Sequence, residues 1–156
     1  MVHYFSRLVL LLVCVLSPAS AFAGSGSLGY FEYEKVGIPR TAVIRPKIEP
    51  RKVGRKLPNL FEEAMQKAMR KGIATYGEGN RVLAAHSGPP KAERFPTDSL
   101  FAPLEKAEIG DTFTYQGKTY TVYKIEIVHP SNLSVLKVPK GEIRLQTCFP
   151  IKSQRE

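Results

Sequence analysis

Apolar and polar residues alternate along segment 143–148, which predicts a β-strand. One face of this strand would carry Ile143, Leu145 and Thr147, and the other face Arg144, Gln146 and Cys148. Pro150 would end the pairing, because proline has no N–H to donate to a ladder. The Cys148 thiol would then lie at a strand end, on a polar face beside a loop, where a scaffold can present a nucleophile.

A helical pattern covers residues 58–71 and ends before Gly72. Its apolar face consists of Leu60, Phe61, Ala64, Met65, Ala68 and Met69. We interpret the two methionines as core packing rather than as a ligand site, since methionine is usually buried.

Thr, Tyr, Val and Ile are concentrated in segments 112–115 and 119–128, and the turn sequence between them predicts a β-hairpin. A short strand over 81–85 ends at His86, where Ser-Gly-Pro-Pro breaks it. Shorter predictions are a strand at 41–45, a helical turn at 99–104 and a turn at 131–136. About six strands and two helices without β-α alternation predict a mostly β fold, a small and mainly antiparallel barrel with flanking helices.

The N-terminus has the pattern of an export signal over residues 1–23. Arg7 precedes an apolar run, and Ala-Phe-Ala at 21–23 fits a cleavage site. A short membrane anchor that is not cleaved is the alternative, although the run is shorter than the ~20 residues that span a bilayer. Residues 24–56 are interpreted as a linker and basic N-terminal segment, and residues 57–156 as the folded domain.

The chain is basic, with 23 Lys and Arg against 14 Asp and Glu and a formal charge of +9. Arg7 is the only charged residue among residues 1–23. Removal of this segment therefore leaves 22 Lys and Arg against 14 Asp and Glu, a formal charge of +8. Such a charge favours contact with anionic lipid or an acidic cell envelope, or it serves only solubility. No Arg-rich tract interleaved with aromatic residues indicates nucleic acid.

The number of cysteines limits the roles that Cys148 can have. Cys14 lies in the predicted signal, so the exported chain would keep only Cys148. A single thiol forms no internal disulfide, and it is therefore an intermolecular link, a reactive nucleophile or an inert buried residue.

Two residues, a histidine and an arginine, could assist a cysteine nucleophile. His86 ends its strand as Cys148 does, whereas His129 precedes Pro130 and is expected to be a surface group. A histidine can raise the thiolate fraction and protonate a leaving group. The planar guanidinium of Arg155, seven positions after Cys148, can hold an oxyanion.

Three motifs in order resemble those of the sortases, exported cysteine transpeptidases of the bacterial cell envelope. Leu-Gln-Thr-Cys at 145–148 resembles the family signature Leu-x-Thr-Cys. Gly-Asn-Arg-Val-Leu-Ala-Ala-His at 79–86 resembles the strand that ends in the family histidine. Leu-Phe-Ala-Pro-Leu at 100–104, followed by Gly-Asp at 110–111, resembles the segment between them.

The resemblance implies an eight-stranded barrel with flanking helices and a role for each matched residue. Cys148 would be the nucleophile, His86 the general acid and base, Arg155 the oxyanion-binding arginine and Thr147 a residue lining the substrate site. The implied reaction cleaves a C-terminal sorting motif of the Leu-Pro-x-Thr-Gly type and forms a thioester. An amine of the cell wall or of a pilin, or water, then resolves the thioester. No cofactor or metal is implied, and the location would be extracytoplasmic, in the envelope or at the membrane.

One departure concerns the strand that the family places after its arginine, beside the cysteine strand. Only Glu156 follows Arg155, which predicts that this last strand is missing and that the cysteine strand has an unpaired edge. An incomplete sequence is the favoured explanation, and a degenerate protein or a strand from a partner are the others. Alternative functions are a non-catalytic sortase-like peptide-binding domain, another envelope cysteine enzyme such as an L,D-transpeptidase, and a β-domain that dimerises through its thiol.

Overall fold

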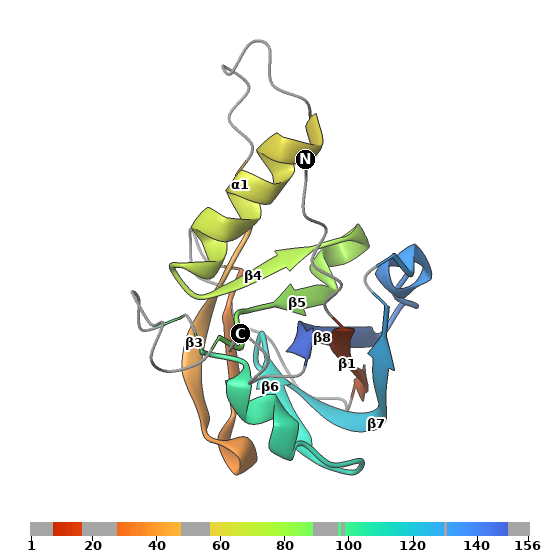
Figure 1. Ribbon diagram of the computed structural model, residues 1–156. Helices are drawn as coiled ribbons and strands as arrows, with labels where there is room; N and C mark the ends of the chain where they lie inside the picture. Colours follow the sequence, from red (N-terminus) through yellow and green to blue (C-terminus); the bar gives the residue numbers. More distant parts are fainter. Residues whose placement is uncertain are drawn as a thin grey trace.

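The computed structural model describes residues 8–16, 28–47, 57–88, 97, 99–129 and 131–149, and it shows a barrel of short strands with one α-helix (Figure 1). Seven strands form most of the barrel: β2 (Tyr30–Tyr33), β3 (Ile38–Ile44), β4 (Ile73–Tyr76), β5 (Val82–Ala84), β6 (Thr112–Tyr115), β7 (Lys118–Val128) and β8 (Glu142–Phe149). The helix α1 is Leu57–Met69, and the 3-10 helices are η1 (Glu34–Val36), η2 (Glu78–Asn80), η4 (Ala102–Lys106) and η5 (Leu133–Leu136). The prediction of a mostly β barrel with flanking helical segments is confirmed.

The seven strands are ordered β7-β6-β2-β3-β4-β5-β8 around the barrel. Two neighbouring pairs are parallel, β3 with β4 and β5 with β8, and the other pairs are antiparallel. The sheet is therefore mixed. Parallel pairing of β5 with β8 matters most here, because it directs the C-terminal ends of both strands to the same end of the barrel.

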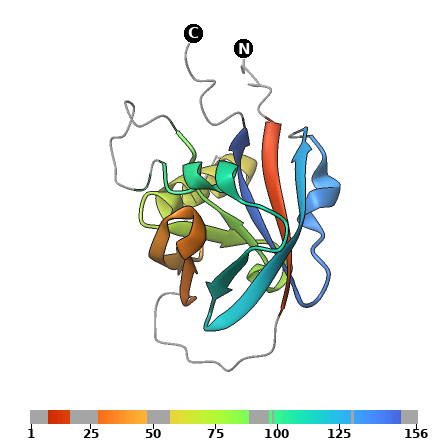
Figure 2. The same ribbon diagram turned by 90° about the horizontal axis from the view of Figure 1, so that it is seen from below.

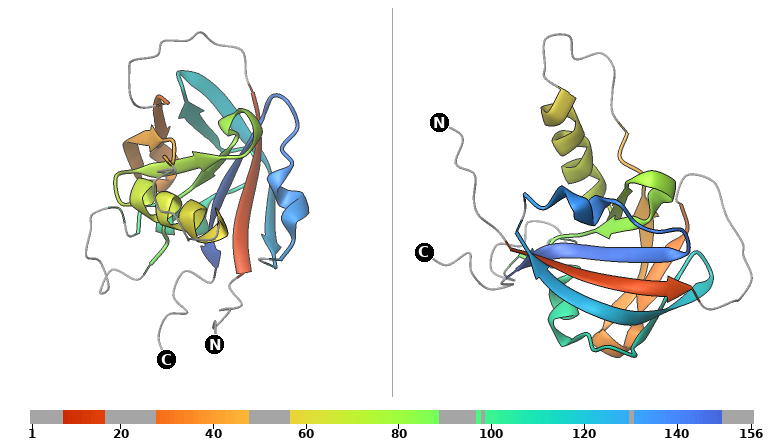
Figure 3. Two further views of the ribbon diagram at one scale, coloured as in Figure 1. Left: turned by 90° about the horizontal axis from the view of Figure 1, so that it is seen from above. Right: turned by 90° about the vertical axis from the view of Figure 1, so that its right-hand side faces the viewer.

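The barrel has a seam between β7 and β8, which do not pair with each other. The backbone of β1 (Leu8–Leu16) lies in this seam and pairs antiparallel with both strands (Figures 2 and 3). Val9 is level with Val128 on one side and with Cys148 on the other. The expected open edge of the cysteine strand is thus covered by residues from the N-terminal segment. Removal of residues 1–23 on export stays a prediction.

No helix among the described residues has the length and apolar character needed to cross a membrane.

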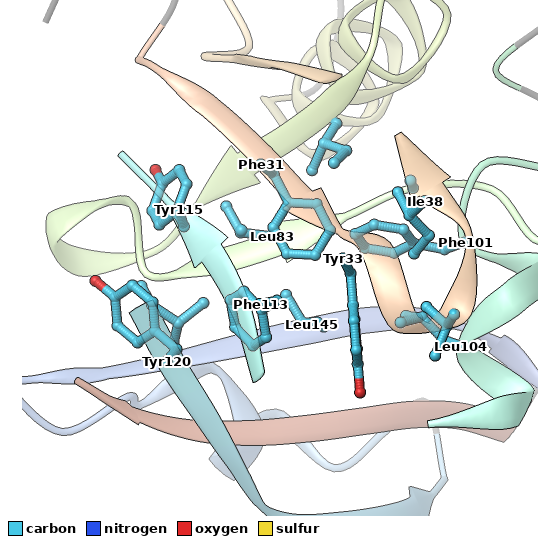
Figure 4. Close-up of a cluster of buried hydrophobic side chains, with 14 of the residues drawn as sticks. Phe31, Tyr33, Ile38, Leu83, Phe101, Leu104, Phe113, Tyr115, Tyr120 and Leu145 are labelled. Carbon is cyan, nitrogen blue, oxygen red and sulfur yellow. The ribbon is translucent and has the colours of Figure 1, made fainter. Parts of the chain in front are cut away.

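Aromatic side chains fill the barrel interior (Figure 4). Phe113 of β6 packs against Phe31, Tyr33 and Tyr120, with ring centroids between 5.1 and 5.8 Å apart. Leu83 and Leu145 face each other across the β5–β8 pair and are completely buried. Burial of each such side chain stabilises the fold by about 1.5–3 kcal/mol.

The helix α1 covers the outer face of the sheet beside β4 (Figure 1). Met65 and Ala68 of α1 pack on Ala74 of β4 and Ala84 of β5, and Met69 contacts the same cluster. The interpretation of the methionines as core residues is confirmed. Glycine is required after the helix, because a Cβ at position 72 would collide with the backbone carbonyl oxygen of Ala42.

The hairpin between β6 and β7 follows its predicted position. Its two turn residues, Gln116 and Gly117, have φ values of 53° and 72°, as in the tight turns that suit twisted hairpins. The Gln116 side chain also donates to the carbonyl oxygen of Leu28 at 2.6 Å, which ties the turn to the start of β2.

A buried carboxylate links η1 to the loop before β6. Asp111 is 7% exposed and accepts hydrogen bonds from Tyr33 Oη, from the backbone N–H of Glu108 and from Lys35 Nζ. Burial raises the pKa of Asp111, but the bonds from Lys35 and Tyr33 outweigh it and hold that pKa below its ordinary value. The Gly-Asp motif at 110–111 therefore has a structural role in this barrel.

Other predictions differ from the structure in their bounds. The strand expected at 41–45 is the longer β3, and the helical turn expected at 99–104 is η4. The strands β2 and β4 were not predicted, and β2 and β3 show that the segment interpreted as linker and basic N-terminal segment contributes to the barrel. Pro150 lies outside the described residues.

Candidate active site

The cysteine strand has the faces that alternation predicts. Ile143, Leu145 and Thr147 are buried toward the barrel interior, whereas the residues between them are half-buried on the outer face. Cys148 is the penultimate residue of β8 and a free, half-buried thiol. Its sulfur therefore belongs to the outer face of the sheet, where solvent reaches it.

His86 follows β5, the parallel neighbour of β8. The register pairs Leu83 with Leu145 and Ala84 with Gln146, so two further steps bring His86 level with Cys148. Neighbouring strands lie ~4.8 Å apart. The residues before His86 alternate as well, since Ala85 belongs to the interior cluster and Ala84 to the cluster under α1. This places His86 on the same outer face as Cys148.

Hydrogen bonds hold the end of β5 against the end of β8. Ala85 N–H donates to Gln146 O at 3.4 Å, and Thr147 Oγ1 donates to Ala85 O at 3.1 Å. One residue beyond His86, Ser87 Oγ donates to Cys148 O at 2.7 Å. Three hydrogen bonds thus join residues 85–87 to residues 146–148.

His86 itself is held from its other side. Its carbonyl oxygen accepts a hydrogen bond of 2.8 Å from the N–H of Phe101, which is completely buried in the barrel core. The motif at 100–104 therefore supports the backbone of the histidine through the N–H of Phe101.

A polar pair lies next to the cysteine on the outer face. Tyr76 Oη of β4 donates to Gln146 Oε1, and the ring of Phe61 meets Tyr76 edge-on at 6.1 Å. Burial raises the pKa of Tyr76 to about 12, so its hydroxyl stays protonated at neutral pH and remains a donor. Gln146 precedes Cys148 by two residues and lies on the same face of β8. The hydrogen bond from Tyr76 fixes the orientation of its side-chain amide.

The other predicted site residues lie elsewhere. Thr147 is 3% exposed on the inner face, with its hydroxyl bonded to Ala85 O, and its substrate-binding role stays a prediction. Arg155 lies outside the described residues. His129 is exposed at the end of β7, as expected, with Nδ1 2.7 Å from Ser131 Oγ.

The sequence did not single out Ser87 or Tyr76. Ser87 looked like part of a strand-breaking run, and its bond to Cys148 joins residues 61 positions apart. Tyr76 belongs to a strand of four residues, too short for a clear alternating pattern. The position of Ser87 directly after the candidate histidine was the one available signal.

Within the described residues, no group of three or more His, Cys, Asp or Glu side chains is arranged to hold a metal ion. Among the described residues at the ends of β5 and β8, the reactive groups are the thiol of Cys148 and the imidazole of His86.

Comparison with known proteins identifies the family. The family model described as the sortase domain matches residues 36–156 of the chain. No curated protein and no solved structure gave a match. The matched region covers most of the chain and includes β5 and β8 together with the residues at their ends. The chain therefore belongs to the sortase family.

Proposed function

We propose that this protein is a sortase-type cysteine transpeptidase that cleaves a C-terminal sorting motif of the Leu-Pro-x-Thr-Gly type. Sortases are typically cysteine transpeptidases and act outside the cytoplasm. The observation that carries the proposal is the placement of His86 level with Cys148 at the ends of two parallel strands. The hydrogen bonds between these strand ends support a fixed pair rather than two unrelated surface residues.

In the first half of the reaction, the Cys148 thiolate attacks the carbonyl carbon of the scissile peptide bond. The C–N bond then breaks, and His86 gives its proton to the departing amine, which leaves a thioester on Cys148. A histidine within hydrogen-bonding reach of the thiol raises the thiolate fraction before attack.

In the second half, an amine of the cell wall or of a pilin attacks the thioester carbonyl. His86 accepts the proton of this amine, a new amide bond forms, and the C–S bond breaks, which restores the Cys148 thiolate and the protonated His86. Water in place of the amine gives hydrolysis. Arg155 is proposed to hold the oxyanion that forms in both halves, because its charge and planar fork suit that task.

The proposal is tested by thioester trapping. Full-length protein is incubated with a panel of sorting-motif peptides, and the acyl-protein is measured by mass spectrometry; hydroxylamine then replaces the natural amine in a turnover assay. We expect Cys148→Ala to abolish the acyl-protein and His86→Ala to lower turnover by about a hundredfold or more, since general acid–base groups contribute 10²–10⁴-fold.

His129→Ala is the matched control. His129 follows Val128, which is level with Cys148 but separated from it by β1, so the two strands are roughly 10 Å apart. This variant should keep its activity. Peptide binding without any acylation of Cys148 would overturn the proposal in favour of a non-catalytic binding domain. A disulfide-linked dimer on non-reducing electrophoresis, without acylation, would favour the dimerising thiol.

A further inference from the structure

The end of the cysteine strand carries a hydrogen bond that strand pairing alone does not supply. In the parallel β5–β8 ladder, Ala85 N–H donates to Gln146 O, and the next regular donor to β8 would be the backbone N–H two residues later, aimed at Cys148 O. The chain departs from β5 at this point. The bond to Cys148 O comes instead from the side-chain hydroxyl of Ser87, at 2.7 Å.

Ser87 is well placed to make this bond constant. The residue is 4% exposed, so little water can compete for the hydrogen bond. The residue is adjacent to His86, whose own carbonyl is held by Phe101 N–H at 2.8 Å. A shift of the Ser87 backbone would therefore displace His86, and a shift of the Ser87 hydroxyl would displace the backbone of Cys148.

We infer that Ser87 is a positioning residue that fixes the distance between the imidazole of His86 and the thiol of Cys148. The inference rests on the proposed function, because the distance matters only if the two side chains exchange a proton. Ser87 acts through the backbone of Cys148 and not on substrate. Its loss should lower the rate of chemistry while leaving peptide binding nearly unchanged.

The first test uses the reactivity of the thiol and requires no substrate. The rate of Cys148 alkylation by iodoacetamide is measured from pH 5 to pH 9 in the full-length protein, in Ser87→Ala and in His86→Ala. A thiol paired with an imidazole reacts at lower pH than an isolated one. We expect the Ser87→Ala profile to shift toward the His86→Ala profile, and Ser87→Thr, which keeps the hydroxyl, to restore it.

The second test separates binding from chemistry in the hydroxylamine assay. Ser87→Ala should lower kcat by about ten- to a hundredfold with KM changed less than about threefold, since small misplacements of reacting groups cost up to ~10²-fold. Thr41→Ala is the matched control. Thr41 Oγ1 donates to Pro39 O at the same 2.7 Å, on β3, and its loss should leave both kinetic constants unchanged.

The outcomes distinguish the two claims. If Cys148 forms no acyl-protein in the trapping assay, the proposed function fails, whereas an alkylation profile that His86→Ala leaves unchanged refutes the coupling on which the positioning role of Ser87 depends. If His86→Ala shifts the profile but Ser87→Ala does not, the proposed pair stands and the positioning role of Ser87 is refuted. Circular dichroism of each variant excludes unfolding as the cause, and the restored profile of Ser87→Thr does so independently.

Discussion

At the scale of single residues, the face of the sheet on which a side chain lies decides what that side chain can do. Thr147 and Cys148 are neighbours, yet the first is sealed inside the barrel and the second lies on the outer face. Alternation along the sequence was sufficient to predict this. The partners of these residues were not predictable, because bonds such as Ser87 to Cys148 depend on how distant strands pair.

Replacement of the signature threonine tests its structural contribution. Thr147→Val keeps the shape but removes the hydroxyl that donates to Ala85 O, leaving a buried carbonyl with one partner fewer. We expect the free energy of unfolding to fall by about 1–3 kcal/mol, measured by urea denaturation. The same substitution at Thr114, exposed on β6, should change it by less than about 0.5 kcal/mol. Equal effects at both positions would show that the hydrogen bond from Thr147 to Ala85 O does not stabilise the fold.

Replacement of the buried carboxylate of Asp111 should weaken the dependence of stability on pH in the acidic range. The folded-state pKa of Asp111 is held below its ordinary value of 3.8, so its stabilising effect is complete above that value and is lost as the pH falls through the lowered one. Asp111→Asn should therefore be less stable than the unaltered protein at pH 7, with a difference that shrinks below about pH 4. Thermal unfolding from pH 2 to pH 7 measures this. A difference that stays constant over the whole range would contradict it.

At the scale of elements, predictions succeeded where the pattern was long. The helix, the hairpin and the cysteine strand each contain several repeats of their period, and each was found within a few residues of its expected bounds. The strands β2 and β4 have four residues each, too few to establish an alternation. The β4 pattern is also obscured because Ile73, Ala74 and Thr75 are all buried, between the barrel interior and α1.

The contact of α1 with the sheet depends on small side chains. Ala68 of the helix packs against Ala74 and Ala84, which leaves little room for larger groups. Ala68→Leu should lower the free energy of unfolding by about 1–3 kcal/mol through overpacking, as measured by urea denaturation. Lys67→Leu adds a similar side chain at the neighbouring exposed position and should be nearly neutral. If Ala68→Leu is equally neutral, the helix does not pack closely on β4 and β5.

At the scale of the molecule, the arrangement of β1 was beyond sequence reasoning. Residues 8–16 have the composition of an export segment, and nothing local indicates that they pair with strands more than a hundred positions away. The order of the strands likewise depends on long-range pairing. The sequence therefore predicted the barrel class and the ends of β5 and β8, whereas the closure of the barrel came from the structure.

A proline in β1 tests whether this strand closes the barrel. Leu12 is level with Ile125 on β7 and with Leu145 on β8, so Leu12→Pro removes a backbone donor between two strands. We expect faster amide hydrogen exchange along β8 in the full-length protein, measured by mass spectrometry. Leu12→Ala keeps the N–H and should affect β8 much less. Unchanged exchange in the proline variant would show that β8 is protected without β1.

The parallel pairing of β5 and β8 also has a consequence for protein engineering. Both strands end at the same end of the barrel, and β7 ends there too, since Val128 and Cys148 share the level of Val9. The connecting segments after β5 and β7 therefore start beside Cys148, while the bonds that align His86 with Cys148 involve residues 85–87. We expect that exchange of the segment after Gly88 for foreign sequence would leave the alkylation profile of Cys148 intact, because the aligning bonds lie before that segment.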